Sequence, residues 1–170
     1  MNLAPRTKKI AALTATGLLV VAVAFVAVLA LLIGNAPEKE PVVSAYANGR
    51  AVDVEPYLYC AVSDPLCTNV GETTEIQVGK APAVQLSLPE AVYSAPWVLA
   101  LVYGDDSGNV VEDSAFNEPG TRLSVTVPTT DDSDRTLLGI EIRLPTGIID
   151  TDTNQEGFVS HAIWSIGTRP

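Results

Sequence analysis

The first strong pattern along the chain is an uninterrupted apolar segment near its N-terminus. Ile10 to Ile33 is a run of 24 residues without a charge. As a helix this run would measure about 36 Å at about 1.5 Å per residue, which is enough to cross a hydrocarbon core of about 30 Å. The pattern predicts a transmembrane helix over residues 10–33.

The charges on the two sides of this segment are asymmetric. Basic residues dominate before it and acidic residues after it: Arg6, Lys8 and Lys9 precede, and Glu38, Lys39 and Glu40 follow. Because basic residues stay preferentially on the cytoplasmic side, residues 1–9 are predicted to be a cytoplasmic tail. Residues 34–41 are then a linker, and residues 42–170 form an extracytoplasmic domain of a single-pass plasma-membrane protein.

The alternative interpretation of this segment is a cleaved signal peptide. The apolar region of a signal peptide has about 7–15 residues and ends in a small-residue cleavage site. Here the apolar region is longer, and the one candidate site, Gly34-Asn35-Ala36, would place Pro37 directly after the cut. These two features favour an uncleaved anchor.

Beyond the linker, apolar and polar residues alternate in short segments. This period of two, with one apolar face, is typical of a half-buried antiparallel strand. The Asn48-Gly49 pair between two apolar runs also predicts a tight hairpin. The alternating apolar residues are Val84, Leu86 and Leu88 in one segment, Leu123, Val125 and Val127 in a second, and Leu138, Ile140, Ile142 and Leu144 in a third.

Several short strands at near-regular spacing are typical of a β-sandwich. Trp97 to Tyr103 is apolar on both faces, so it is predicted to be a central strand covered on both sides; Tyr57 to Val62 is another strand, and Phe158 to Ile166 is the last one. A tryptophan on a central strand is also a feature of immunoglobulin-like sandwiches, which this pattern of strands resembles. The predicted fold class is therefore all-β: an antiparallel immunoglobulin-like β-sandwich ectodomain preceded by one transmembrane helix.

The charge of the predicted domain restricts its partners. All 20 acidic residues lie beyond residue 36, against seven basic ones, so the outer part carries 7 − 20 = −13. This charge repels nucleic acid and anionic headgroups. We therefore expect the domain to bind no nucleic acid.

The only two cysteines, Cys60 and Cys67, are seven positions apart across a Ser63-Asp64-Pro65 turn. A zinc site needs about four ligands, and a redox pair is normally C-x-x-C. In an oxidising compartment this spacing favours a disulfide over both alternatives.

No motif in the sequence requires catalysis. His161 is the only histidine, and no G-x-S-x-G turn accompanies it. The segment from Asp150 to Glu156 places oxygen ligands at alternate positions, but it lacks the glycine and the final glutamate of a calcium loop. We therefore expect no catalytic, cofactor-binding or metal-binding residues. His161 and Trp164 on the last strand remain candidate contact residues for a partner.

Several segments together resemble a known family: PYLYC, LPEAVYSAPWVLALVY, EPGTRLSVTVPT, LLGIEIRL and SHAIWSI. They are similar to short single-pass envelope proteins of mycolic-acid-containing actinobacteria, a family that is a domain of unknown function. The resemblance implies an inner-membrane anchor and a domain in the cell envelope, and it carries no reaction or catalytic residues.

Together these features predict a non-enzymatic, membrane-anchored accessory or scaffold protein in envelope assembly or transport. It would bind an envelope protein through an edge strand or one sheet face. The alternative is a lipid- or glycan-binding envelope domain with an apolar slot between the two sheets.

Overall fold

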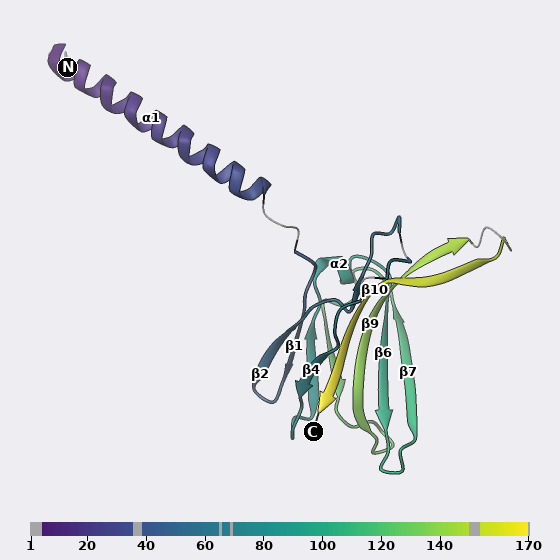
Figure 1. The fold of residues 1–170 in the computed structure, drawn as a ribbon. Helices are drawn as coiled ribbons and strands as arrows, with labels where there is room; N and C mark the ends of the chain where they lie inside the picture. Colours follow the sequence, from purple (N-terminus) through teal and green to yellow (C-terminus); the bar gives the residue numbers. More distant parts are fainter. Residues whose placement is uncertain (1–4, 36–38, 65, 69, 150–153, 170) are drawn as a thin grey trace. The chain divides into compact units, whose positions relative to one another are not determined.

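The computed structural model describes residues 5–35, 39–64, 66–68, 70–149 and 154–169, and only the backbone of residues 5–13. The chain divides into two compact units, Met1–Lys39 and Glu40–Pro170 (Figure 1). Each unit is described separately below.

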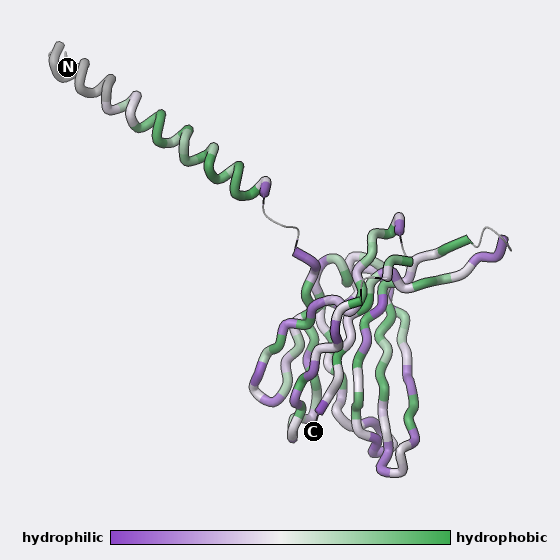
Figure 2. Tube along the Cα trace, viewed as in Figure 1, coloured by the Kyte–Doolittle hydropathy of each residue, from purple (hydrophilic) through white to green (hydrophobic). Residues whose placement is uncertain are grey.

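The first unit contains one helix, α1 (Pro5–Gly34). It begins before the predicted span because residues 6–9 continue the same helix. Within the described residues, one helix segment is long and apolar enough to cross a membrane, the 21 residues Thr14–Gly34. Figure 2 shows the apolar residues along this segment. Membrane anchors and signal sequences both contain such a helix.

The second unit consists mainly of antiparallel β-strands. Residues 42–170 were predicted to be all-β, yet one short turn of helix, α2 (Glu90–Tyr93), lies between two strands. The strands of the described residues are β1 (Val43–Ala47), β2 (Arg50–Val54), β3 (Leu58–Tyr59), β4 (Thr74–Gln77), β5 (Ala83–Ser87), β6 (Trp97–Gly104), β7 (Val110–Asn117), β8 (Ser124–Pro128), β9 (Thr136–Ile149) and β10 (Glu156–Arg169).

These strands form two sheets. One has the order β2-β1-β5-β8; the other has the order β3-β10-β9-β6-β7, with β4 pairing beside β10. The pairing of β4 with β10 is parallel, whereas the other ladders between named strands are antiparallel. β1 and β2 form the predicted hairpin, in which Asn48 and Gly49 have φ of 48° and 75°, as a tight two-residue turn requires.

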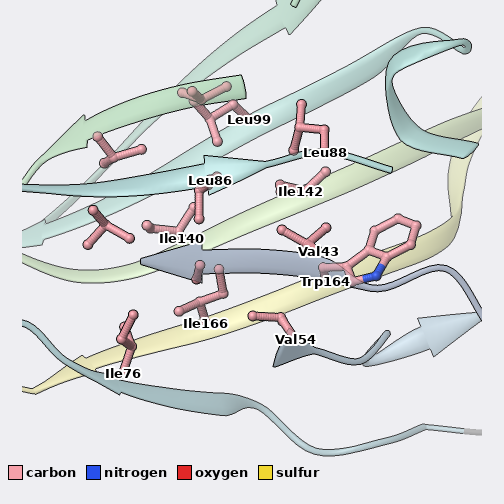
Figure 3. Close-up of a cluster of buried hydrophobic side chains, with 14 of the residues drawn as sticks. Val43, Val54, Ile76, Leu86, Leu88, Leu99, Ile140, Ile142, Trp164 and Ile166 are labelled. Carbon is pink, nitrogen blue, oxygen red and sulfur yellow. The ribbon is translucent and has the colours of Figure 1, made fainter. Parts of the chain in front are cut away.

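One hydrophobic core lies between the two sheets (Figure 3). Alternate residues of each strand point into it, because successive side chains of a strand face opposite ways. Val43, Leu86 and Val127 come from the first sheet, and Ile140 and Trp164 come from the second. Each of these five side chains is at most 1% exposed. The alternation in the sequence therefore identified the buried face of β5, β8 and β9, except at two positions. Leu123, which precedes β8, is 60% exposed, and Leu138 is 44% exposed while its neighbour Leu137 is buried.

Two strand predictions need correction, and two further strands were missed. The strand expected over Tyr57–Val62 is reduced to β3, because the chain turns away to close the cysteine loop. β6 is central in its sheet, but Val98 and Val102 are only half-buried, so its outer face is not fully covered. β4 and β7 were not predicted at all. The loop from Asp150, considered for calcium, lies largely outside the described residues.

Candidate functional site

The two cysteines lie at the end of the domain where β3 finishes. The structure joins Cys60 to Cys67, with their Cα atoms 5.8 Å apart. Cys60 is 4% exposed, and the segment after it turns at once, since the backbone N–H of Asp64 donates to the carbonyl of Ala61 at 2.8 Å. The pair closes a short surface loop, which fits a structural role.

His161 lies beside this loop, on β10. The ladder between β9 and β10 is irregular between Ser160 and Ala162, so His161 is an extra residue in the strand. Its carbonyl accepts the N–H of Cys60 at 2.8 Å, and its Nδ1 lies 3.2 Å from the carbonyl oxygen of Cys60. These contacts make the histidine a support for the cysteine loop.

Trp164 is placed in the core, not on the surface. Its side chain is 0% exposed, its Nε1 donates to the carbonyl of Pro41 at 2.9 Å, and its ring lies edge-on to Tyr59 with the centroids 6.2 Å apart. A buried side chain cannot contact a partner of the folded domain. The interpretation of Trp164 as a contact residue is therefore wrong.

The feature of the described residues that best fits a binding site is the edge strand β7. It pairs with β6 on one side and with no strand on the other (Figure 1). Seven of its eight residues are exposed, including Val110 at 60% and Phe116 at 64%. An exposed edge of this kind presents unpaired backbone groups that can pair with another chain.

The register of β7 shows which backbone groups are free. In an antiparallel pair, residues alternate between hydrogen-bonded and non-hydrogen-bonded positions. Asp105 donates its N–H to the carbonyl of Asn109 at 3.0 Å, so the hydrogen-bonded pairs continue through Tyr103 and Val111. The residues of β7 whose N–H and C=O point away from the sheet are therefore Val110, Glu112, Ser114 and Phe116.

Natural proteins usually protect such an edge with charged side chains, above all lysine, with an inward-pointing charge, or with proline, a bulge or a short strand. β7 contains neither lysine nor proline, and its register with β6 is unbroken from Val110 to Asn117. Its only devices of this kind are the acidic residues Glu112 and Asp113, of which Asp113 points inward. The edge of the other sheet at β8 is different. It is five residues long, and at its end Pro128 has no N–H and its carbonyl accepts the hydroxyl of Tyr103 at 3.1 Å.

A hollow of about 610 Å³ lies against the inner side of β7. Its apolar floor includes Leu101, Tyr103 and Val111, and its rim is acidic. The other lining residues are Glu112, Asp113, Pro128, Thr130, Asp131, Asp132, Ser133 and Arg135. The hollow and the free edge of β7 are therefore parts of one surface, which we call the β7 surface.

The carboxylates around this hollow differ in their partners. Asp131 is bound to Arg135 at 2.6 Å, and its Oδ1 accepts the backbone N–H of Ser133 at 2.9 Å. Desolvation raises the pKa of Asp131, but the hydrogen bonds from Arg135 and Ser133 outweigh it and leave the pKa below its ordinary value. Among the described residues, no hydrogen bond or ion pair engages the carboxylates of Asp113 and Asp132.

Two nearby groups have shifted pKa values. Burial, followed by the charges of Asp131 and Asp113, raises the pKa of the Tyr103 hydroxyl. Asp113 lies on the same face of the sheet as Tyr103, because Val111 is directly opposite Tyr103 and Asp113 is two residues further along β7. In the β6–β7 turn, hydrogen bonds from Asn109 lower the pKa of Asp105. Asp105 and Asp131 each accept backbone N–H groups from the residues that follow them, and each thus stabilises its own turn.

Sequence reasoning missed this surface. Glu112 and Asp113 are adjacent in the sequence and therefore point to opposite faces of β7. The segment Val110–Asn117 has no period of two, because seven of its eight residues are exposed and neither face is fully buried. The one available signal was the turn sequence after β6, which implies a returning strand.

Comparison with known proteins agrees with the resemblance in its broad form. A family model described as "Protein of unknown function (DUF2771)" matches residues 36–169. The uncharacterized proteins Rv0875c of Mycobacterium tuberculosis and Mb0899c of Mycobacterium bovis are each 39% identical over 137 residues, covering 80% of this chain and 82% of the relative. No solved structure matches the chain significantly. The chain belongs to the family described as "Protein of unknown function (DUF2771)", which has members in mycobacteria.

Proposed function

We propose that the protein is a non-enzymatic, membrane-anchored accessory or scaffold protein of the cell envelope, and that it binds an envelope protein by strand addition at β7. The observation that carries this proposal is the free edge of β7, which is eight residues long, in unbroken register with β6, and without lysine or proline. Strand addition supplies affinity through main-chain hydrogen bonds, and the side chains on the two faces supply specificity.

The anchor in this proposal is α1. Its apolar segment Thr14–Gly34 is long enough to span a bilayer, and the basic residues before it favour a cytoplasmic N-terminus with the domain outside. Five residues separate Gly34 from Glu40. At about 3.3–3.6 Å per residue these can extend by roughly 20 Å, so an uncleaved anchor keeps the domain close to the membrane that holds its partner.

The strand order of the two sheets can be assigned to the immunoglobulin-like pattern, and this assignment supports a binding module. In immunoglobulin-like sandwiches one sheet has the order A-B-E-D and the other contains G-F-C, to which some members add C′. The orders β1-β5-β8 and β10-β9-β6-β7 fit A-B-E and G-F-C-C′. In this assignment β7 is strand C′ at the edge, and strand D is missing next to β8, which leaves this side of the sandwich open.

The alternative of a lipid or glycan slot between the sheets has less support. Such a slot would be lined by the inward-facing residues of both sheets. The two largest side chains of this core, Trp97 and Trp164, are 0% exposed and occupy the space between the sheets. The close packing favours the protein-binding function.

Site-specific photo-crosslinking in the native membrane tests the proposal. A photoreactive amino acid would replace Ser114 or Phe116 on β7, or Ala51 on the edge strand β2 as the matched control. We expect both β7 positions to crosslink to the same membrane or envelope protein, and the β2 position not to. Equal crosslinking from β2 and β7, or none from β7, would contradict strand addition at this edge.

A further inference from the structure

A strand added to β7 would meet two different faces. Its residues opposite Val110, Glu112, Ser114 and Phe116 share the outer face with them, because directly opposite residues of a pair point the same way. The two ends of this face are apolar, since Val110 and Phe116 are 60% and 64% exposed. Apolar residues of the incoming strand would cover them.

The residues between these positions would point to the other side, over the hollow. There the strand passes Val111, Asp113 and Ala115, which share the inner face with the buried Asn117 at the end of β7. The hollow also contains Asp132. Its apolar floor could contact the aliphatic stem of a long side chain whose charged head reaches the rim.

The charge of the hollow selects the sign of that head group. The charge of Asp131 is matched by Arg135, and Oε1 of Glu112 lies 3.3 Å from Nη1 of Arg143, with which it forms an ion pair. Within the described part of the chain, no basic side chain pairs with Asp113 or Asp132. With a charge of 7 − 20 = −13 on the part of the chain beyond residue 36, the surrounding potential also favours a cation.

A second copy of the chain fits this surface poorly. Antiparallel pairing of two β7 strands with Val110 opposite Phe116 would cover the apolar ends. The same register places Asp113 directly opposite its own copy, and like charges in that position are destabilising. Each domain would also bring the same large negative charge.

We propose, resting on strand addition at β7, that the partner segment is an extended strand in which apolar residues alternate with lysine or arginine. Its apolar residues cover the outer face at Val110 and Phe116, and its basic residues lie over the hollow and pair with Asp113 and Asp132. The partner is thus recognised by an alternating apolar and basic strand.

Peptide binding to the full-length protein in detergent tests this inference. The probes are three eight-residue fluorescent peptides with blocked ends, in which valine alternates with lysine, serine or glutamate. We expect the lysine peptide to bind about tenfold more tightly than the serine peptide at low salt, since two exposed ion pairs are gained, and the glutamate peptide to bind most weakly. The difference should shrink at high salt.

Substitutions separate the contribution of the acidic side chains to peptide binding from the contribution of the outward-pointing backbone groups of β7. The double substitution Asp113→Asn, Asp132→Asn should bring the lysine peptide to the affinity of the serine peptide. Asp64→Asn in the cysteine loop is the matched control and should change nothing. Ser114→Pro removes an outward N–H without removing a bond to β6, so it should weaken all three peptides, provided that its thermal unfolding shows a folded domain.

The outcomes distinguish the two proposals. If the lysine and serine peptides bind equally and Ser114→Pro weakens both, the basic partner is wrong while strand addition stands. If no peptide binds, or if Ser114→Pro has no effect while Phe116→Ser also has none, strand addition at β7 is itself wrong. If the protein self-associates and Ser114→Pro abolishes this self-association, the partner at β7 is a second copy of the chain and not a basic strand.

Discussion

The indole Nε1 of Trp164 donates a hydrogen bond to the carbonyl oxygen of Pro41, 2.9 Å away. This contact joins the last strand to the first residues of the domain across 123 positions of sequence. Trp97 is equally buried, at 0% exposure, but its Nε1 finds no acceptor among the described residues. Two buried tryptophans of one core thus differ in a single hydrogen bond.

This difference predicts unequal effects of the same substitution. Trp164→Phe leaves the Pro41 carbonyl without its donor, whereas Trp97→Phe removes an N–H that is buried without a partner. Both lose similar volume, so we expect Trp164→Phe to lower the free energy of unfolding by about 1–2 kcal/mol more than Trp97→Phe. Urea unfolding of the two variants measures this. An equal or larger loss for Trp97→Phe would mean that its indole N–H has an acceptor.

The disulfide predicts a second stability difference. A closed loop of about eight residues contributes roughly 2.5 kcal/mol in the chain-entropy model. Replacing both cysteines, Cys60→Ala with Cys67→Ala, should lower the free energy of unfolding by about that amount. Reduction of the wild-type protein with dithiothreitol is the matched condition and should give the same loss. If reduction changes nothing, the two cysteines are not paired in solution.

The elements predicted from the sequence are those whose pattern is local. Asn48 and Gly49 specify their own turn, and both have positive φ. In β5, Val84 and Leu86 alternate with polar residues because one face of the strand is buried. For such strands the burial itself selects the residue types, so the sequence records it.

The candidate site could not be predicted because it depends on neighbours that are distant in sequence. β7 has an uncovered inner face only because the other sheet ends at β8, and no residue of β7 indicates this. His161 meets the carbonyl of Cys60 across 101 positions. Trp164 was considered for the surface because tryptophan is common both in binding sites and in cores, and only the tertiary packing decides between them.

The Asp131 carboxylate in the β8–β9 turn predicts that the stability of the folded protein depends on pH. The pKa of Asp131 lies below its ordinary value of 3.8 in the folded protein, so its ionised form contributes stability above about pH 4. That stability is lost as the pH falls through the lower pKa of the folded state. Asp131→Asn should therefore destabilise the protein at pH 7, and its difference from the wild type should shrink at pH 3.

The neighbouring residue gives a matched control for this prediction. Asp132 is exposed, and no described residue binds its carboxylate. We expect Asp132→Asn to leave the urea midpoint unchanged at pH 7, whereas Asp131→Asn lowers it. Equal midpoints for the two variants would show that the bonds to Arg135 and Ser133 do not stabilise the fold.

The membrane anchor gives the last prediction. If residues 10–33 stay uncleaved, protein extracted from its own membrane has the mass of the whole chain, resists extraction by alkaline carbonate, and loses its domain to protease added outside the cell. Substituting Arg6, Lys8 and Lys9 with glutamate should reduce the fraction of molecules with this orientation, because the basic residues hold the N-terminus in the cytoplasm. Pro37→Ala is the matched test of cleavage: the length of the apolar segment should keep this variant intact as well. A mature protein that begins near residue 37 would show instead that the helix is a signal sequence.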